Sequence, residues 1–186
     1  MEEIIALKKE LRKQIKVLKA TLSAEEKQLK SEQIFNSLEL LPQFQQSRIV
    51  FAYWAMADEV QTQEFVERWS NSKLMLLPKV DGEDLRLKIY RGEESMAPGE
   101  AFGILEPIGE DFTDYVSIDF IVVPGVGFDK AKNRMGRGKA YYDKILNSTH
   151  AFKAGVCFDV QILDDVPCEP HDVKMDAVFT ETLSIL

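Results

Sequence analysis

A stretch of basic residues and glycines, RMGRGKAYYDKIL, occupies positions 134–146. Six cations and two anions lie between Asp129 and Lys144, so this region carries a net charge of +4 in a chain whose overall charge is -8. Gly136 and Gly138 allow backbone amides to approach a ligand closely, and a helix expected to begin near Gly138 would add the positive end of its dipole. Together these features predict an anion site, most plausibly for a polyphosphate.

The same stretch has a plainer interpretation. It matches neither the G-x-x-x-x-G-K-[ST] phosphate loop nor the G-x-G-x-x-G dinucleotide loop, so the anion site rests on composition and spacing alone. A solvated basic turn, with an ion pair between Lys139 and Asp143 one helical turn apart, would explain the same residues. Taken alone, the stretch leaves both interpretations open.

Several residues elsewhere could join an anion or metal site. Lys8 and Arg12 lie on one face of a predicted helix, where two cations usually only face solvent. Asp172 and Asp176 could bind Mg²⁺ together with Asp143, because this ion favours one or two carboxylates plus phosphate oxygens. Caps and turns explain such aspartates equally well.

Three further side chains could act on an organic ligand. His171 is a possible general base, although an isolated loop histidine more often has no such role. Trp54 and Met56 could line the pocket of a flat aromatic ligand, or they could belong to the core.

The helices that must position these residues follow from hydrophobic spacing. Apolar residues at positions 4, 7, 11, 15, 18 and 22 form the stripe of an amphipathic helix, with Lys8 and Arg12 beside it. Ser23 and Glu26 form a capping box, which predicts a second helix that begins there and ends near Pro42.

Short apolar segments predict a sheet, with strands at 48–55, 73–78, 85–90, 118–123, 153–158 and 176–180. A short helix capped by Thr62 joins the first two strands into a parallel unit. The strand at 118–123 is almost continuously apolar and should be central, whereas 85–90 alternates and should expose one face. This order predicts a three-layer α/β domain, with a ligand at the carboxyl ends of the strands, where PGVGFD (124–129) leaves the central strand.

Length and composition limit the classes of function. A chain of 186 residues with 45% hydrophobic content can bury one core, so we expect one domain over 1–186. The net charge of -8 argues against non-specific binding to nucleic acid or to a membrane surface. The chain has no long apolar run and no signal-like N-terminus, and its two cysteines, Cys157 and Cys168, are expected to be reduced, so we expect a cytoplasmic protein. We also expect a monomer whose partner is a small molecule.

Five stretches taken in order resemble the 5-formyltetrahydrofolate cyclo-ligase family, also called methenyltetrahydrofolate synthetase. They are FAYWAMADEVQT, LPKV, GILEP, IDFIVVPGVGFDKAKNRMGRGKAYYDKIL and HDVKMDAVFTE. The resemblance runs through nearly the whole chain, beginning with the helix that carries Lys8 and Arg12. Its most specific part is R-x-G-x-G-K-x-Y-Y-D after a P-G-x-x-F-D turn.

The resemblance implies an α/β/α sandwich and an ATP-dependent ring closure. In that reaction, phosphorylation of the formyl oxygen lets 5-formyltetrahydrofolate become 5,10-methenyltetrahydrofolate, with release of ADP and phosphate. Carried over by position, Mg²⁺ would be held by Asp143 and Asp172, and the folate by Met56, Glu59, Gln61 and Tyr142. ATP would be held by Lys8, Arg12, Arg134, Met135, Gly136, Arg137, Gly138, Lys139, Ala140, Tyr141 and Tyr142, of which Arg137, Lys139 and Tyr142 would take part in catalysis.

Two positions depart from the family pattern. The family commonly has an acidic residue where this chain has Gln61, and a glycine where it has Ala140. The first departure concerns the folate contact; the second concerns the phosphate loop, where a methyl group on the first turn of a helix is a small obstruction. Two other functions stay open, a sugar-phosphate isomerase on a related α/β scaffold and a non-catalytic folate or nucleotide binder.

Overall fold

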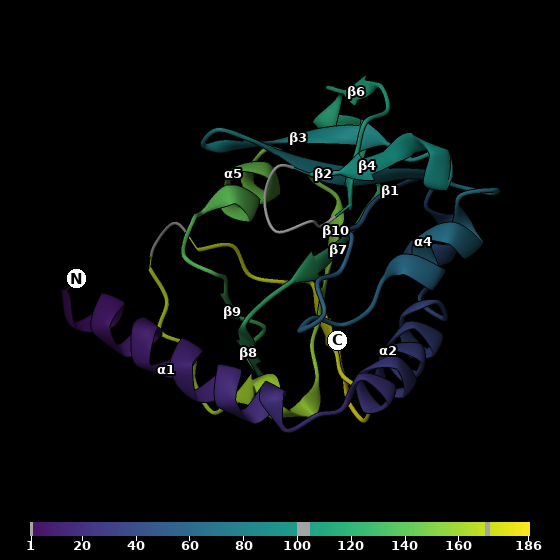
Figure 1. The fold of residues 1–186 in the computed structure, drawn as a ribbon. Helices are drawn as coiled ribbons and strands as arrows, with labels where there is room; N and C mark the ends of the chain where they lie inside the picture. Colours follow the sequence, from purple (N-terminus) through teal and green to yellow (C-terminus); the bar gives the residue numbers. More distant parts are fainter. Residues whose placement is uncertain (1, 100–104, 170–171) are drawn as a thin grey trace.

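The computed structural model describes residues 2–99, 105–169 and 172–186 (Figure 1). Its centre is an eight-stranded sheet with the strand order β13-β12-β10-β7-β1-β2-β3-β6. The five strands from β12 to β2 pair in parallel, and the strands at both edges pair antiparallel. The mainly parallel sheet predicted from sequence is therefore confirmed. The bounds are β1 (Ile49–Phe51), β2 (Leu74–Asp81), β3 (Asp84–Ile89), β6 (Asp111–Phe112), β7 (Phe120–Pro124), β10 (Phe152–Val156), β12 (Ala177–Phe179) and β13 (Ser184–Ile185).

Two smaller sheets accompany the central one. The order β11-β8-β9 joins β8 (Gly127–Asp129), β9 (Arg134–Met135) and β11 (Ile162–Leu163), and β4 (Met96–Pro98) pairs with β5 (Leu105–Pro107). Within the described residues, single 3₁₀ turns lie at η1 (Glu93–Ser95), η2 (Tyr115–Ser117) and η3 (Asp159–Gln161).

Helices cover both faces of the central sheet. On one face lie α2 (Ala24–Leu38), α3 (Pro42–Gln46) and α4 (Gln63–Trp69), which bury Phe35, Phe44 and Phe65 against alternate residues of the strands. On the other face lies α5 (Tyr141–Asn147), which buries Ile145 and Leu146. This arrangement gives the three layers that the sequence predicts (Figure 1).

Helix α1 (Glu2–Ala20) buries part of the predicted apolar stripe, with Ile15 in the core and Leu11 packed beside it. Leu7 and Leu18 of the predicted apolar stripe remain 50% and 47% exposed, whereas Lys8 and Lys19 are buried together with Ile15. The helix is rotated because acidic loops of the rest of the chain supply partners for the two ammonium groups, which apolar spacing alone does not reveal.

Several elements begin or end at other residues than predicted, and one predicted cap is absent. The first strand ends at Phe51, and the chain then leaves the sheet. Thr62 is the N-cap residue of α4, but its hydroxyl donates to the Tyr53 carbonyl and accepts from the Ala55 amide, so it does not cap the helix. The capping box of α2 is confirmed, but this helix ends at Leu38, and Pro42 instead begins α3, a position that suits a residue without an N–H.

The sheet has a topological switch point between β1 and β7. The chain passes from β1 through α4 to β2 on one side, and from β7 through α5 to β10 on the other side. The carboxyl ends of these two parallel strands are therefore adjacent, which is where open α/β sheets bind ligands. No helix in the described part of the chain is long and apolar enough to cross a membrane.

Candidate active site

Two loops meet at the switch point. One covers residues 52–62 after β1, and the other, called here the basic loop, covers residues 136–140 between β9 and α5. The Arg137 guanidinium joins them, because its Nη2 donates to Asp58 Oδ1 at 3.0 Å and to Glu59 Oε1 at 2.9 Å. Residues predicted to hold a polyphosphate thus lie beside residues predicted to hold an organic ligand.

Arg12 of α1 lies against the basic loop. Its Nε donates to the Gly136 carbonyl at 2.9 Å. Gly138 has a φ of +95°, and a Cβ built there would lie 3.5 Å from Arg12 Nη2. Gly138 therefore supplies a backbone conformation that other residues rarely adopt, next to a guanidinium group that faces the loop.

Arg134 is buried and holds the loop from within. Its Nε donates to the Pro124 carbonyl at 3.0 Å, and its Nη1 contacts Asp143 Oδ1 at 3.0 Å. Only 6% of its side chain is exposed. Burial lowers the pKa of Arg134, and the Asp143 carboxylate opposes that shift. The ATP contact predicted for Arg134 stays a prediction, whereas its structural contacts are evident.

Unlike the buried Arg134, Lys139 lies at the surface. It is exposed, its Nζ lies 5.8 Å from the centre of the Tyr141 ring, and it forms no ion pair with any described residue. The ion pair with Asp143 considered above is wrong, because Asp143 pairs with Arg134. Lys139 is thus a cation of the basic loop whose charge is available to a ligand.

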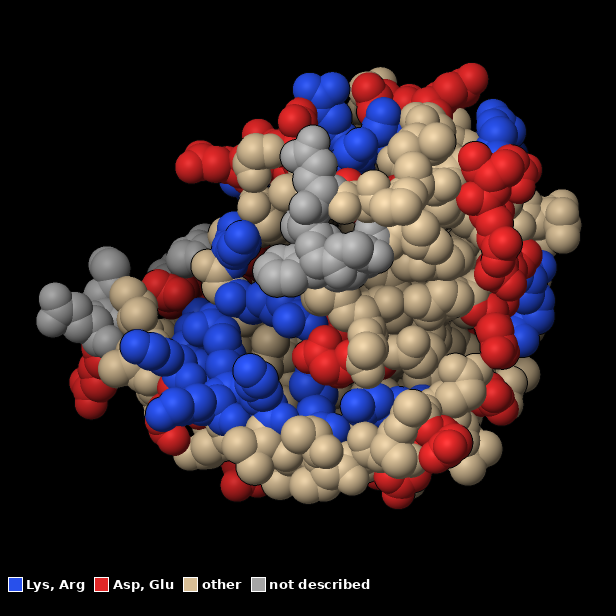
Figure 2. Space-filling view, in the orientation of Figure 1, with Lys and Arg blue, Asp and Glu red and all other residues tan. Residues whose placement is uncertain are grey.

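A wider basic surface surrounds the loop. In Figure 2, Lys and Arg side chains gather over α1 and the neighbouring part of the molecule. Lys9, Lys13 and Lys16 of α1 are exposed and have no ion pair within the described ranges. This surface explains how a chain of charge -8 can attract an anion at one place.

The sequence predicted Ala140 on the first turn of a helix, and this prediction is wrong. Helix α5 begins at Tyr141, and Ala140 is its N-cap residue with a φ of 53° and a ψ of 14°. This left-handed conformation suits glycine and costs an alanine free energy. The glycine that the resemblance implies at this position would therefore have a conformational reason.

Ala140→Gly is expected to stabilise the protein by about 1 kcal/mol, because it relieves the left-handed strain. Chemical denaturation at equilibrium measures this change. Ala6→Gly, in the interior of α1, is the matched control and should destabilise by about 0.5–1 kcal/mol, since its helical conformation does not need glycine. Equal destabilisation by both substitutions would contradict the strain at Ala140.

The 52–62 loop and Arg137 line a cavity of about 560 Å³. This volume lies within the range of about 300–1,000 Å³ that is typical of small-molecule sites. Met56, predicted to contact the folate, lines the cavity. Glu59 holds the Met56 backbone in place. One of its carboxylate oxygens accepts from Arg137, and the other accepts from the Met56 amide at 3.0 Å. The full lining is Trp54, Ala55, Met56, Ala57, Asp58, Leu105 and Arg137.

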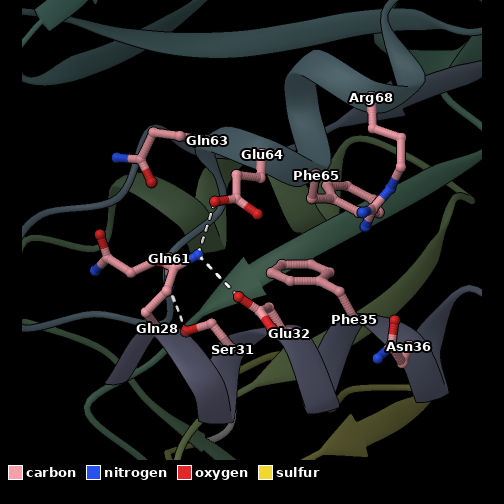
Figure 3. A pocket seen from close by; sticks show the side chains of 10 residues that line it. All are labelled: Gln28, Ser31, Glu32, Phe35, Asn36, Gln61, Gln63, Glu64, Phe65 and Arg68. Carbon is pink, nitrogen blue, oxygen red and sulfur yellow. Dashed lines mark hydrogen bonds between the residues drawn. The ribbon is translucent and has the colours of Figure 1, made fainter. Parts of the chain in front are cut away.

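Gln61 closes the 56–59 turn from behind. Its Nε2 donates to the Met56 carbonyl at 2.9 Å and to the Glu59 carbonyl at 2.7 Å, and its backbone amide donates to Ser31 Oγ. Gln61 also lines a second hollow, of about 230 Å³, between α2 and α4 (Figure 3). Since both partners of the side chain are carbonyls, its amide nitrogen must face them, and a carboxylate could not replace it there.

The chain matches the family model of the 5-formyltetrahydrofolate cyclo-ligase family over residues 4–181. It belongs to this family. The mouse 5-formyltetrahydrofolate cyclo-ligase is 29% identical over 94% of this chain and 93% of its own length. The family prediction made from sequence is therefore confirmed.

Solved structures agree with this assignment. The 5,10-methenyltetrahydrofolate synthetase of Aquifex aeolicus is 35% identical, with a TM-score of 0.85 over 96% of this chain and 91% of that one. A second synthetase, from Mycoplasma pneumoniae, is 26% identical, with a TM-score of 0.72 over 94% of this chain and 98% of that one. The α/β fold class predicted from sequence is confirmed as that of a cyclo-ligase.

Tyr142, the second residue of α5, has a buried hydroxyl. Its ring stacks on Phe51 with centroids 5.6 Å apart, and its hydroxyl has no hydrogen-bond partner among the described residues. Burial raises the pKa of Tyr142, Glu59 raises it further, and Arg134 opposes the shift. The hydroxyl therefore stays protonated near neutral pH, as a donor for which a ligand atom could supply the missing acceptor.

The two predicted metal ligands each lie beside a protein cation. Asp143 contacts Arg134, and Asp172 Oδ2 accepts from Lys8 Nζ at 2.9 Å. Lys8, predicted to contact ATP, also binds Glu169 at 3.0 Å, so in this structure it holds an acidic loop. The described ranges contain no group of three or more His, Cys, Asp and Glu side chains that could hold a metal.

Two other candidates of the sequence analysis contribute less. Asp176 Oδ2 accepts from the Lys153 amide at 2.7 Å, so the structural explanation of this residue holds. His171 lies outside the described residues. Both cysteines are free, as predicted.

Sequence reasoning missed Lys19 and the role of Asp58. The Lys19 ammonium donates to the Asp58 carbonyl at 2.7 Å and to Asp58 Oδ2 at 2.8 Å. A signal was present, because Lys8 and Lys19 are separated by three helical turns and so share one face of α1. It was passed over because lysines on a helix usually face solvent.

Proposed function

We propose that this protein catalyses the ATP-dependent conversion of 5-formyltetrahydrofolate to 5,10-methenyltetrahydrofolate, with release of ADP and phosphate. The family match over residues 4–181 carries the proposal. The mouse relative is named 5-formyltetrahydrofolate cyclo-ligase and the Aquifex aeolicus structure 5,10-methenyltetrahydrofolate synthetase, which are two names for this one activity.

The chemistry explains why a basic loop lies beside an organic-ligand cavity. The formyl oxygen is a poor leaving group, so the γ-phosphoryl group of ATP is transferred to it and ADP leaves. The second folate nitrogen then attacks the formyl carbon, the ring closes, and phosphate departs with that oxygen. Phosphoryl transfer asks the protein for positioning and positive charge rather than for a covalent nucleophile.

The site residues divide these tasks. Lys139 supplies an unpaired charge for the transferred phosphoryl group, and Arg137 stands between the basic loop and the folate cavity. Tyr142 supplies a buried, neutral hydroxyl donor. Met56 lines the folate cavity, and Glu59 holds the turn that forms its wall.

Magnesium is part of the proposal. Asp143 and Asp172 would hold it, and the donor set fits, because Mg²⁺ binds through one or two carboxylates together with phosphate oxygens rather than through a closed protein cage. When bound, the ion would neutralise phosphate charge. Arg134 and Lys8, which contact these carboxylates, keep them in place without it.

A coupled assay tests the proposed function. Methenyltetrahydrofolate is followed by its absorbance and ADP by an independent readout, with purified protein, 5-formyltetrahydrofolate, ATP and Mg²⁺. We expect one ADP per methenyl product, and no product when ATP is omitted or the metal is chelated. Binding without turnover, or product formed without ATP, would refute the proposal. The proposal also takes the enzyme to be a cytoplasmic monomer, which a measurement of mass in solution and cell fractionation test.

Gln61→Glu is expected to weaken the enzyme rather than restore a lost folate contact. A carboxylate at this position would face the Met56 and Glu59 carbonyls, which now accept from the Gln61 amide. Leaving such acceptors unpaired costs about 1–3 kcal/mol, and the added charge repels them. We therefore expect a lower Tm and a higher KM for 5-formyltetrahydrofolate, with the KM for ATP little changed.

Gln61→Met is the matched control, since it removes the donors without adding charge. It should lie between the wild type and Gln61→Glu in Tm and in folate KM. A tenfold or larger decrease in the folate KM of Gln61→Glu alone would show that the family's carboxylate meets the substrate directly, contrary to this expectation.

A further inference from the structure

Helix α1 holds three loops of the site with three cations on one face. Lys8 holds Glu169 and Asp172, Arg12 holds the Gly136 carbonyl of the basic loop, and Lys19 holds Asp58. The helix runs beside β8 and β9, as Figure 1 shows. The cations recur after four and seven residues, which keeps them on one side of a helix. Of the three cations, Lys19 is the one for which the sequence alone points to no role.

Lys19 is buried in an unusual way for a lysine. Only 7% of its side chain is exposed, and its ammonium donates to both the carbonyl and the carboxylate of Asp58. A buried ammonium group costs free energy unless it is paired and hydrogen-bonded, and Asp58 satisfies it from the backbone and the side chain together. This double contact fixes the position of the 56–59 turn relative to α1.

The contact continues into the site. Asp58 uses its Oδ2 for Lys19 and its Oδ1 for Arg137, and Arg137 also contacts Glu59, which accepts from the Met56 amide. Burial would raise the pKa of Asp58, but Lys19 and Arg137 outweigh burial and hold it below its usual value, so Asp58 stays charged. A continuous chain of charged contacts thus leads from α1 to the wall of the cavity.

We propose that Lys19 is a positioning residue for the folate. It fixes the 56–59 turn, whose Met56 and Asp58 line the cavity, and through Asp58 it presents the Arg137 guanidinium at the boundary between the cavity and the basic loop. Lys19 itself does not line the cavity. The inference rests on the proposed function, because it assigns the cavity to the folate.

Lys19→Met tests the inference, because it keeps the length of the side chain and removes the charge. We expect the KM for 5-formyltetrahydrofolate to rise about tenfold, since a small misplacement of a binding wall has effects of this size, with kcat changed by less than about threefold. Lys19→Arg, which keeps the charge and the donors, should recover most of the loss. Lys27→Met is the matched control. It removes a lysine of α2 that has no ion pair within the described ranges, and it should leave both constants unchanged.

A double-mutant cycle with Asp58→Asn separates positioning from general destabilisation. If Lys19 acts through Asp58, Lys19→Met should add little to the folate KM in the Asp58→Asn background. Additive effects would overturn the inference, and so would a lower Tm of Lys19→Met without a change in folate KM. The two proposals fail in different ways. A wild-type protein that forms no product refutes the proposed function. A wild-type protein that turns over, together with a Lys19→Met variant of the same folate KM, refutes only this inference.

Discussion

Lys139→Ala is expected to lower kcat by about 100-fold and to leave the stability of the fold unchanged. The lysine is exposed, has no ion pair in the described part of the chain and has its Nζ 5.8 Å from the centre of the Tyr141 ring, so its removal costs the folded state little. Its charge lies at the basic loop, where the proposed reaction develops negative charge on the transferred phosphoryl group, and losing one such stabilising group typically costs about 10²–10³-fold.

Steady-state kinetics at saturating ATP measure this effect, and thermal unfolding checks the fold. Lys130→Ala is the matched control, because Lys130 is an exposed lysine that precedes β9 in the same basic segment. It should retain wild-type kcat. Near-normal turnover of Lys139→Ala would show that the phosphoryl group is stabilised elsewhere, with Arg12 and Arg137 as the remaining candidates in the described site.

The parts of the fold that the sequence predicts well depend on local signals. The Ser23 and Glu26 capping box forms because both partners lie within one helical turn, and both of its hydrogen bonds are present. The apolar run predicted as a central strand at 118–123 forms β7 (Phe120–Pro124), whose first four residues are fully buried, as expected for a strand covered on both faces.

The burial of two lysines of α1 in place of two leucines could not be predicted in this way. Apolar spacing favours Leu7 and Leu18, but partners distant in sequence decide the outcome, since Lys8 and Lys19 find carboxylates more than 35 residues away. Lysine side chains are expected at the surface unless the fold supplies a buried carboxylate or carbonyl that accepts hydrogen bonds from the ammonium group. Residues that depend on such partners, Lys19 above all, are therefore the ones that the sequence analysis missed.

The basic loop shows the same limit within the site. Its composition predicts an anion site, but not which cations are available to an anion. Arg134 and Lys139 are equivalent in that pattern, yet one is buried on Asp143 and the other is exposed. Ala140 likewise looks like a helix residue in sequence, and its left-handed φ appears only once the preceding glycines have set the path of the chain.

Arg134→Met is expected to destabilise the protein by about 3–5 kcal/mol, the usual cost of removing one partner of a buried ion pair. The substitution leaves the Asp143 carboxylate without its cation and the Pro124 carbonyl without its donor. For a chain of this size, such a loss lowers Tm by about 10 °C. Arg137→Met, which removes half-exposed ion pairs, should cost about 1 kcal/mol or less.

The double variant Arg134→Met/Asp143→Leu shows whether the unpaired charge is the cause. Replacing a buried ion pair by apolar residues is often close to neutral, so the double variant should be more stable than Arg134→Met alone, although the loop loses its donor to Pro124. Denaturant unfolding of the wild type, the two single arginine variants and the double variant measures the free energy of unfolding of each. If Arg134→Met costs no more than Arg137→Met, then the arginine is not a structural anchor. Its charge would then be free for ATP, as the family resemblance implied.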